Sequence, residues 1–122
     1  MNLQELHSFF KEQNPTIYRV EDGKVIEYKT LVHNKGKKGV ADVSDIGDDN
    51  TFSVGFSKPS NWKPDYALPF VSVMSINEKT GRIEVEKSAR KGGWDVPGCF
   101  FWEDGDFFLT EDDAKNFINS VS

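Results

Sequence analysis

The chain has few residues whose types and spacing suggest catalysis. Its two histidines, His7 and His33, stand in no HExxH or HxH motif, and neither lies beside the single cysteine, Cys99. A zinc site or a histidine base needs such a grouping, because ligands or an acid–base pair must converge. We therefore expect both histidines to be ordinary polar side chains and Cys99 to be a structural thiol.

Two groups of carboxylates are the next candidates for chemistry. One group, Glu103, Asp104 and Asp106, surrounds a turn, and the other lies within residues 42–49. A divalent cation could use such oxygens, but neither group has the ligand spacing of an EF-hand loop. The glycine-punctuated segment 34–39 likewise lacks the spacing of a phosphate-binding P-loop. We therefore predict solvated polar turns, with no metal, no cofactor and no enzymatic activity.

Large aromatic residues on irregular loops are the better candidates for function. The loop over residues 58–67 contains Trp62, and the loop over residues 88–98 contains Trp94 among charged residues. Aromatic side chains on loops often anchor protein contacts. The alternative is that each tryptophan folds back as a lid over the core. The predicted partner-binding residues are Trp62, Tyr66, Arg90, Lys91, Trp94 and Trp102.

A local basic face around Trp94 is the basis of an alternative function, nucleic-acid or nucleotide binding. Aromatic rings beside Lys and Arg can stack on bases. The formal net charge of −5 argues against wide, non-specific binding to nucleic acid, which needs a phosphate-neutralising surface. The interpretation also requires two basic loops to be neighbours in space. The residues of this face are Lys35, Lys37, Lys38, Lys87, Arg90 and Lys91.

These loops need a scaffold, and the hydrophobic pattern places a helix at each end of it. Leu3, Leu6 and Phe10 recur at helical spacing, so we expect a helix over residues 2–13. It should end at Asn14, because the residue before a proline avoids the helical region. A second helix should follow the acceptor side chain of Thr110, which is the expected N-cap.

Between the helices, turn signals separate short strands. Asp22-Gly23 predicts a two-residue hairpin turn between residues 17–21 and 24–32. Residues 40–46 and 51–57 are expected to pair with each other. A further hairpin is expected from residues 68–76 and 82–87, with Gly81 in a left-handed turn position.

The last strand pair is expected to be a hairpin across Asp104-Gly105. In that register Trp102 would lie opposite Phe107, and Phe101 would lie opposite Phe108. Both faces of the hairpin would then be apolar, whereas a hairpin covered on one side alternates apolar with polar residues. A second element must therefore cover the outer face, and a terminal helix is the expected cover.

This order of elements predicts an α+β fold in a single domain over residues 1–122. Short connections favour antiparallel neighbours. We expect a strongly bent antiparallel sheet or small partly open β-barrel of about seven or eight short strands, with an N-terminal and a C-terminal helix packed on it. Residues 1–14 lack the features of a signal peptide, and no apolar run approaches the length of a membrane span. We therefore expect a cytoplasmic protein, either a monomer or a homodimer.

One local resemblance bears on function. Residues 69–86, PFVSVMSINEKTGRIEVE, resemble the strand–turn–strand hairpin of cystatin-like bacterial proteins, which include some toxin-immunity proteins. The resemblance covers this hairpin alone and assigns the chain to no family. Our leading hypothesis is a non-enzymatic module that binds a protein partner through its Trp-bearing loops, such as an inhibitor or immunity-type protein. Nucleic-acid binding is the first alternative, and a small enzyme that uses clustered carboxylates is the second.

Overall fold

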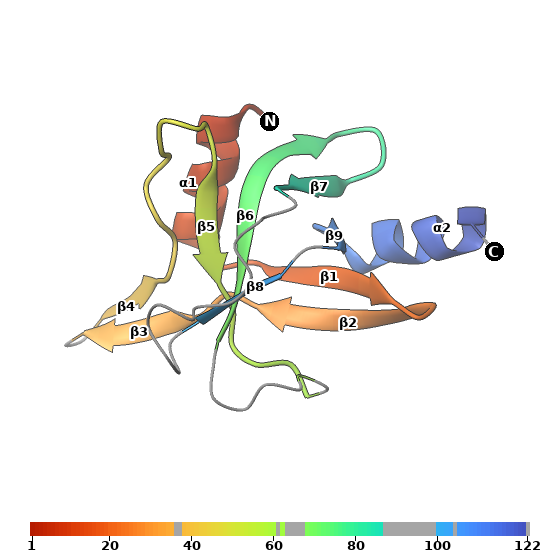
Figure 1. The fold of residues 1–122 in the computed structure, drawn as a ribbon, viewed down its shortest axis with the longest axis horizontal. Coiled ribbons are helices and arrows are strands. Elements are labelled where there is room, and N and C mark those ends of the chain that lie inside the picture. The colour runs from red at the N-terminus through yellow and green to blue at the C-terminus, as the bar shows by residue number, and fades with distance from the viewer. Residues whose placement is uncertain (36–37, 61, 63–67, 87–99, 104, 122) are drawn as a thin grey trace.

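The computed structural model of the chain describes residues 1–35, 38–60, 62, 68–86, 100–103 and 105–121 (Figure 1). Its order of elements confirms the expected α+β class, with a helix at each end of the strands. In chain order these elements are α1 (Leu3–Gln13), β1 (Thr16–Glu21), β2 (Lys24–Lys29), β3 (Val32–Lys35), β4 (Lys38–Ala41), β5 (Phe52–Gly55), β6 (Leu68–Asn77), β7 (Arg82–Val85), β8 (Phe100–Glu103), β9 (Asp106–Phe108) and α2 (Glu111–Val121).

The strands form a strongly curled half-barrel. Antiparallel pairs join six of the described strands in the order β2-β1-β9-β7-β6-β5. β8 lies off this path and pairs with β6 in parallel, while β3 pairs with β4 in a separate two-stranded sheet. The strongly bent antiparallel sheet is therefore confirmed. Its path has six strands rather than seven or eight, because β8 and the β3–β4 hairpin pair outside it.

The β1–β2 hairpin forms at the Asp22-Gly23 turn, as predicted. Both turn residues have a positive φ, 52° at Asp22 and 73° at Gly23, which is the combination that a type I′ turn requires. The register runs from Glu21 opposite Lys24 at the turn to the far ends of the two strands. The turn thereby sets which residues of β2 direct their backbone N–H and C=O groups toward β1.

The expected pairing of residues 40–46 with residues 51–57 is present only in part. β4 pairs with β3 and not with β5, with Asn34 opposite Gly39 and Lys35 opposite Lys38. β5 pairs along its length with β6. Residues 42–44 still run beside β5, where Val43 and Val54 form an isolated antiparallel bridge.

The expected hairpin across Asp104-Gly105 is wrong. β8 pairs in parallel with the first half of β6, which sets Trp102 opposite Phe70 and not opposite Phe107. β9 instead pairs antiparallel with β1 and β7. Since β7 is itself antiparallel to β6, β9 runs in the same direction as β6 and β8. The chain therefore moves sideways in the sheet between β8 and β9 and does not reverse.

β9 is a three-residue strand that joins the two halves of the half-barrel, because it lies between β1 and β7. Its Phe107 is fully buried, with its ring centroid 5.4 Å from that of Tyr28 in β2. Phe108 points to the opposite face, where its ring lies 5.3 Å from Phe117 of α2. The prediction that a terminal helix covers the outer apolar face is confirmed for Phe108.

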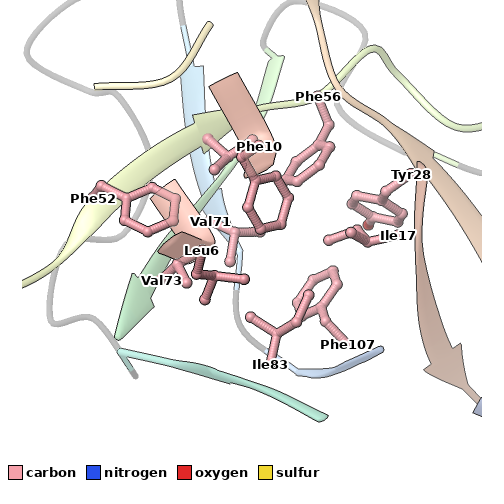
Figure 2. Close-up of a cluster of buried hydrophobic side chains, with 11 residues drawn as sticks. Leu6, Phe10, Ile17, Tyr28, Phe52, Phe56, Val71, Val73, Ile83 and Phe107 are labelled. Carbon is pink, nitrogen blue, oxygen red and sulfur yellow. The ribbon is translucent and has the colours of Figure 1, made fainter. Parts of the chain in front are cut away.

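α1 contributes its apolar face to the core on the inner side of the curled sheet. Leu6 and Phe10 are fully buried, and the Phe10 ring lies 5.8 Å from Phe52 of β5. Figure 2 shows these side chains converging with residues of both sheet halves. The buried cluster consists of Leu6, Phe10, Ile17, Tyr28, Phe52, Val54, Phe56, Val71, Val73, Ile83 and Phe107.

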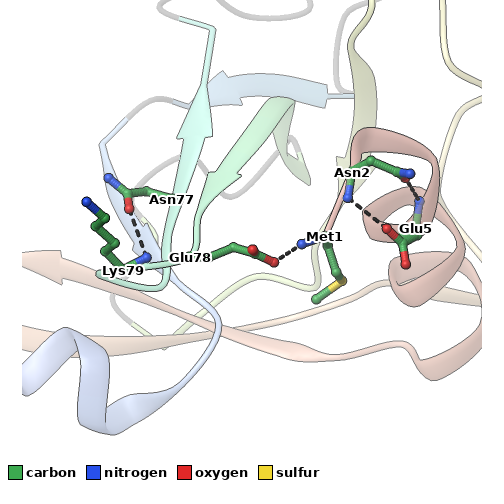
Figure 3. Close-up of polar contacts among 6 residues, drawn as sticks. All are labelled: Met1, Asn2, Glu5, Asn77, Glu78 and Lys79. Carbon is green, nitrogen blue, oxygen red and sulfur yellow. Dashed lines mark hydrogen bonds and ion pairs between the residues drawn. The ribbon is translucent and has the colours of Figure 1, made fainter.

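Local polar contacts determine where α1 begins. Asn2 is the N-cap: its side-chain oxygen accepts from the Glu5 N–H at 2.8 Å, and the Glu5 carboxylate accepts from the Asn2 N–H at 3.0 Å. Figure 3 shows this capping box together with the ion pair between the Met1 amino group and Glu78. The start of α1 is thereby joined to the turn between β6 and β7.

The β6–β7 turn also packs against the start of α2. Gly81 has a φ of 73°, as its predicted left-handed turn position requires, and a Cβ there would overlap the Asp113 carboxylate. Asp113 in turn completes the cap of α2. Its N–H donates to Thr110 Oγ1 at 3.1 Å, and the same hydroxyl donates to its carboxylate at 2.8 Å. The predicted N-cap is confirmed.

The Phe107→Ala variant is expected to lose about 3–5 kcal/mol of unfolding free energy, because removal of a fully buried ring leaves a cavity between the two sheet halves. Met74→Ala is the control, since this side chain is 46% exposed, and it should change the free energy by less than about 0.5 kcal/mol. Urea unfolding followed by circular dichroism measures both. Equal losses in the two variants would contradict the central place of Phe107.

Gly81→Ala is expected to destabilise the fold more than Gly23→Ala. Both glycines have a φ of 73°, so both variants carry a left-handed strain of about 1–2 kcal/mol. The Gly81 variant must also displace Asp113 from Thr110, whereas nothing lies within 4 Å of a Cβ at Gly23. Thermal unfolding of the two variants gives the comparison. A larger loss at Gly23 would show that the contact with Asp113 is unimportant.

Candidate partner-binding groove

The two edge strands of the half-barrel differ in how they are covered. The outer edge of β5 is paired by the segment that follows β4. The Gly55 N–H donates to the Asp42 carbonyl at 2.8 Å, and the Ser44 N–H donates to the Ser53 carbonyl at 2.9 Å. β2 lies at the other end of the strand order. At the far end of β2 its outer edge is closed, because the Lys29 carbonyl accepts from the Ser57 N–H and Thr30 forms an antiparallel bridge with Phe56. Among the described residues, nothing pairs with the rest of this edge, at Val25 and Glu27.

The register of the β1–β2 hairpin shows which backbone groups lie along this open edge. Glu21 and Lys24 flank a two-residue turn and form a hydrogen-bonded pair, so Ile26 and Tyr28 also direct their N–H and C=O groups toward β1. The intervening residues Val25 and Glu27 direct theirs outward. No described residue provides a backbone partner for these outward groups.

A groove of about 740 Å³ runs along the same edge. β2 and its turn form one side, and residues 57–60, which follow β5, form the other; Figure 1 shows the segment after β5 passing beside β2. Ser57 joins the two sides at one end, because its N–H donates to the Lys29 carbonyl at 2.9 Å. We call this feature the β2 groove. It is lined by Glu21, Asp22, Lys24, Val25, Ile26, Glu27, Lys29, Ser57, Lys58, Pro59 and Ser60.

Charges of opposite sign lie at the two ends of the β2 groove. Glu21 and Asp22 stand at the hairpin turn with Lys24, so this end is net acidic. Lys29 stands at the opposite end of β2, and Lys58 follows the Ser57 junction. Asp22, Lys29 and Lys58 are exposed and Glu21 is half-buried. Within the described part of the chain, none of the four forms an ion pair. These charges are therefore available to a bound molecule.

Trp62 is the predicted partner-binding residue that the structure places near the β2 groove. It is half-buried, and its N–H donates to the carbonyl of the groove residue Pro59 at 3.0 Å. Trp102 belongs to β8, where the backbone alone is described. Tyr66, Arg90, Lys91 and Trp94 lie outside the described residues, so the proximity of the two Trp-bearing loops stays a prediction.

Most residues of the alternative basic face also lie outside the residues that the structure describes. Lys35 and Lys38 lie opposite each other in the β3–β4 hairpin, where their backbone is placed. Lys37, Lys87, Arg90 and Lys91 lie outside the described residues. The arrangement of this face therefore stays a prediction, as does nucleic-acid binding.

The polar residues considered for chemistry have structural contacts where they are described. His7 packs edge-on against Phe52, with ring centroids 5.1 Å apart, and its Nε2 lies 2.8 Å from the Ser44 carbonyl oxygen. Asp106 forms an ion pair with Arg82 at 2.9 Å. Among the described residues, no group of three His, Cys, Asp or Glu side chains could hold a metal ion.

Comparisons with protein-family models, with curated proteins and with solved structures find no match to this chain. Neither α1 nor α2, the helices of the described residues, is long and apolar enough to cross a membrane.

Sequence reasoning did not find the β2 groove, although part of its signal was present. The Asp22-Gly23 turn already determined that the backbone N–H and C=O groups of Val25 and Glu27 point away from β1. The missing information was the strand order, in which β2 comes last and no strand pairs with its outer side among the described residues. Charged residues in β2, such as Glu27, are also typical of edge strands.

Amide hydrogen exchange should alternate along β2. We expect the amides of Ile26 and Tyr28 to be protected by β1 and those of Val25 and Glu27 to exchange much faster, because an outward N–H is open to water. Exchange measured residue by residue with NMR provides the test. Strong protection at Val25 and Glu27 in the free protein would mean that another segment covers this edge.

Proposed function

We propose that this chain is a non-enzymatic interaction module that binds a protein partner at the β2 groove. The observation that carries the proposal is the open edge of β2, whose outward backbone groups at Val25 and Glu27 line a groove. Native proteins usually cover or blunt a sheet edge, because its unpaired N–H and C=O groups attract other chains. At the opposite edge of this sheet, residues 42–44 provide such a cover.

The charges of the groove favour a protein partner over nucleic acid. Lys24, Lys29 and Lys58 are balanced by Glu21, Asp22 and Glu27. Affinity for nucleic acid comes largely from neutralising phosphates, which requires a basic surface. A balanced surface instead suits a polypeptide, which carries both signs of charge and offers backbone hydrogen-bonding groups.

Within this proposal, the module is an inhibitor or immunity-type protein of the cytoplasm. The support is the resemblance of residues 69–86 to a hairpin of cystatin-like bacterial proteins. Those residues form the β6–β7 hairpin. The single cysteine cannot form a disulfide within the chain, and a fold without a disulfide is compatible with a reducing compartment. An inhibitor needs aromatic anchors and complementary charge rather than catalytic groups.

Affinity purification from the producing organism, followed by binding measurements with the purified partner, tests the proposal. We expect a single protein to co-purify and to bind the isolated chain. Its affinity should fall at least tenfold in the double variant Lys29→Glu/Lys58→Glu, which reverses one end of the groove. Lys79→Glu is the matched control, because Lys79 lies in the β6–β7 turn and outside the groove. A ligand that nuclease treatment removes, or equal losses in both variants, would overturn the proposal.

Trp62→Ala should weaken binding of the same partner about tenfold or more, since a large aromatic anchor beside the groove is lost. Trp62→Phe keeps an aromatic ring and should lose less. Isothermal titration calorimetry measures the affinities, and circular dichroism checks the fold. If Trp62→Ala unfolds the chain, Trp62 acts as a lid over the core, and its assignment to the binding surface fails.

A further inference from the structure

We infer that the β2 groove takes one extended segment of the partner, which adds to β2 as an antiparallel strand. The segment carries an acidic residue beside Lys29 and Lys58 and a basic residue beside Glu21 and Asp22. This inference rests on the proposed function, because it names how the partner occupies the same groove. It goes further in specifying the backbone conformation, the direction and the charge order of the bound segment.

The backbone of β2 supplies the pairing groups for such a strand. Val25 and Glu27 each direct an N–H and a C=O outward, at the two-residue spacing of a β ladder. An extended peptide that reproduces this spacing satisfies all of these groups at once. A helix cannot do so, because its backbone groups are already used within the helix.

The opposite side of the groove favours one strand rather than a second copy of the chain. Residues 57–60 form this side and are joined to β2 at one end by the hydrogen bond from the Ser57 N–H to the Lys29 carbonyl. The added strand therefore pairs with Val25 and Glu27, where the edge is open. A second copy would bring its own β1 as well, about 4.8 Å further out and toward residues 57–60.

The charges at the groove ends set the charge order of a strand that binds antiparallel to β2. β2 runs from the acidic turn at Asp22 toward the basic end at Lys29 and Lys58. An antiparallel partner strand therefore begins beside the lysines and ends beside the acidic turn. Its N-terminal residue should be acidic and its C-terminal residue basic. The antiparallel arrangement is also slightly more stable per residue than the parallel one.

Synthetic peptides test this inference on the complete chain. The first probe is a six-residue peptide with Glu at its N-terminus, Lys at its C-terminus and alternating Val and Thr between them, blocked at both ends. The second probe exchanges the Glu and Lys. In NMR titrations of the labelled protein, we expect the first peptide to bind about tenfold more tightly, since two surface charge pairs differ in sign. Equal affinities, or tighter binding of the second peptide, would overturn the charge order and direction.

Paired variants separate the backbone contact from the side-chain charges. Glu27→Pro removes an outward N–H at an edge position where proline is tolerated, and it should abolish binding of the first peptide. Glu27→Thr keeps the N–H and should bind the peptide within about threefold of the original chain. Lys58→Glu should reduce the preference for the first peptide, because Lys29 and the acidic turn remain. Equal binding by the proline and threonine variants would overturn strand addition.

Amide exchange provides a measurement that does not depend on how the proline variant folds. Saturation with the first peptide should slow exchange at Val25 and Glu27 at least tenfold and leave Ile26 and Tyr28, which already face β1, nearly unchanged. No protection at Val25 and Glu27 would overturn the inference. Light scattering of the free chain tests whether a second copy of the chain occupies the edge instead. The edge would be assigned to a second copy if the chain is a dimer, if the first peptide does not dissociate this dimer, and if Glu27→Pro converts it to a monomer.

The two proposals can fail separately. If the co-purified protein loses affinity in Lys29→Glu/Lys58→Glu while neither peptide protects the β2 amides, the groove binds a folded surface and the inference of an added strand is wrong. If peptide binding follows the expected charge order but no protein partner responds to the groove variants, the proposed function is wrong.

Discussion

The insertion of β9 between β1 and β7 is the constraint on which the rest of the structure depends. Without this three-residue strand β1 and β7 would share no strand, and the β1–β2 hairpin would be joined to the β5–β6–β7 unit only where residues 29–31 pair with residues 55–57. Two consecutive phenylalanines hold it in place. Phe107 is buried against Tyr28 on the inner face, and Phe108 contacts Phe117 of α2 on the outer face. Burial of both rings compensates for a strand that is too short to be stabilised by many ladder hydrogen bonds.

The strand order also places the candidate site at an edge of the sheet. β9 occupies the free side of β1, and β2, which pairs with β1 on its other side, lies at the end of the strand order. The opposite edge, β5, is covered by residues 42–44 of the same chain. One edge is thus closed by the fold and the other borders a groove. The core packing and the candidate groove thus both depend on the order in which distant strands pair.

Local signals predicted the elements that short-range chemistry controls. The turns at Asp22-Gly23 and at Gly81 were both predicted from residue type, and both are present with positive φ angles. Such turn preferences are nearly independent of the rest of the chain. The Thr110 cap is equally local. Asp104-Gly105 carried the same signal as Asp22-Gly23, yet no reversal occurs there. In that segment β6 offers a free edge to β8, and the core needs Phe107 between β1 and β7, so long-range burial outweighs a turn preference.

The sequence by itself determined the class of the fold, the two terminal helices, the β1–β2 and β6–β7 hairpins, and the need for a cover over the aromatic pair at the end of the chain. It also determined which residues of β2 direct their backbone N–H and C=O groups away from β1. Only the tertiary structure decided that β2 is an edge, that residues 57–60 lie beside it, and that charges of opposite sign mark the ends of the groove. The physical reason is that turn and cap energies depend on neighbours in the chain, whereas the choice of strand partners depends on which apolar surfaces meet from distant parts of it.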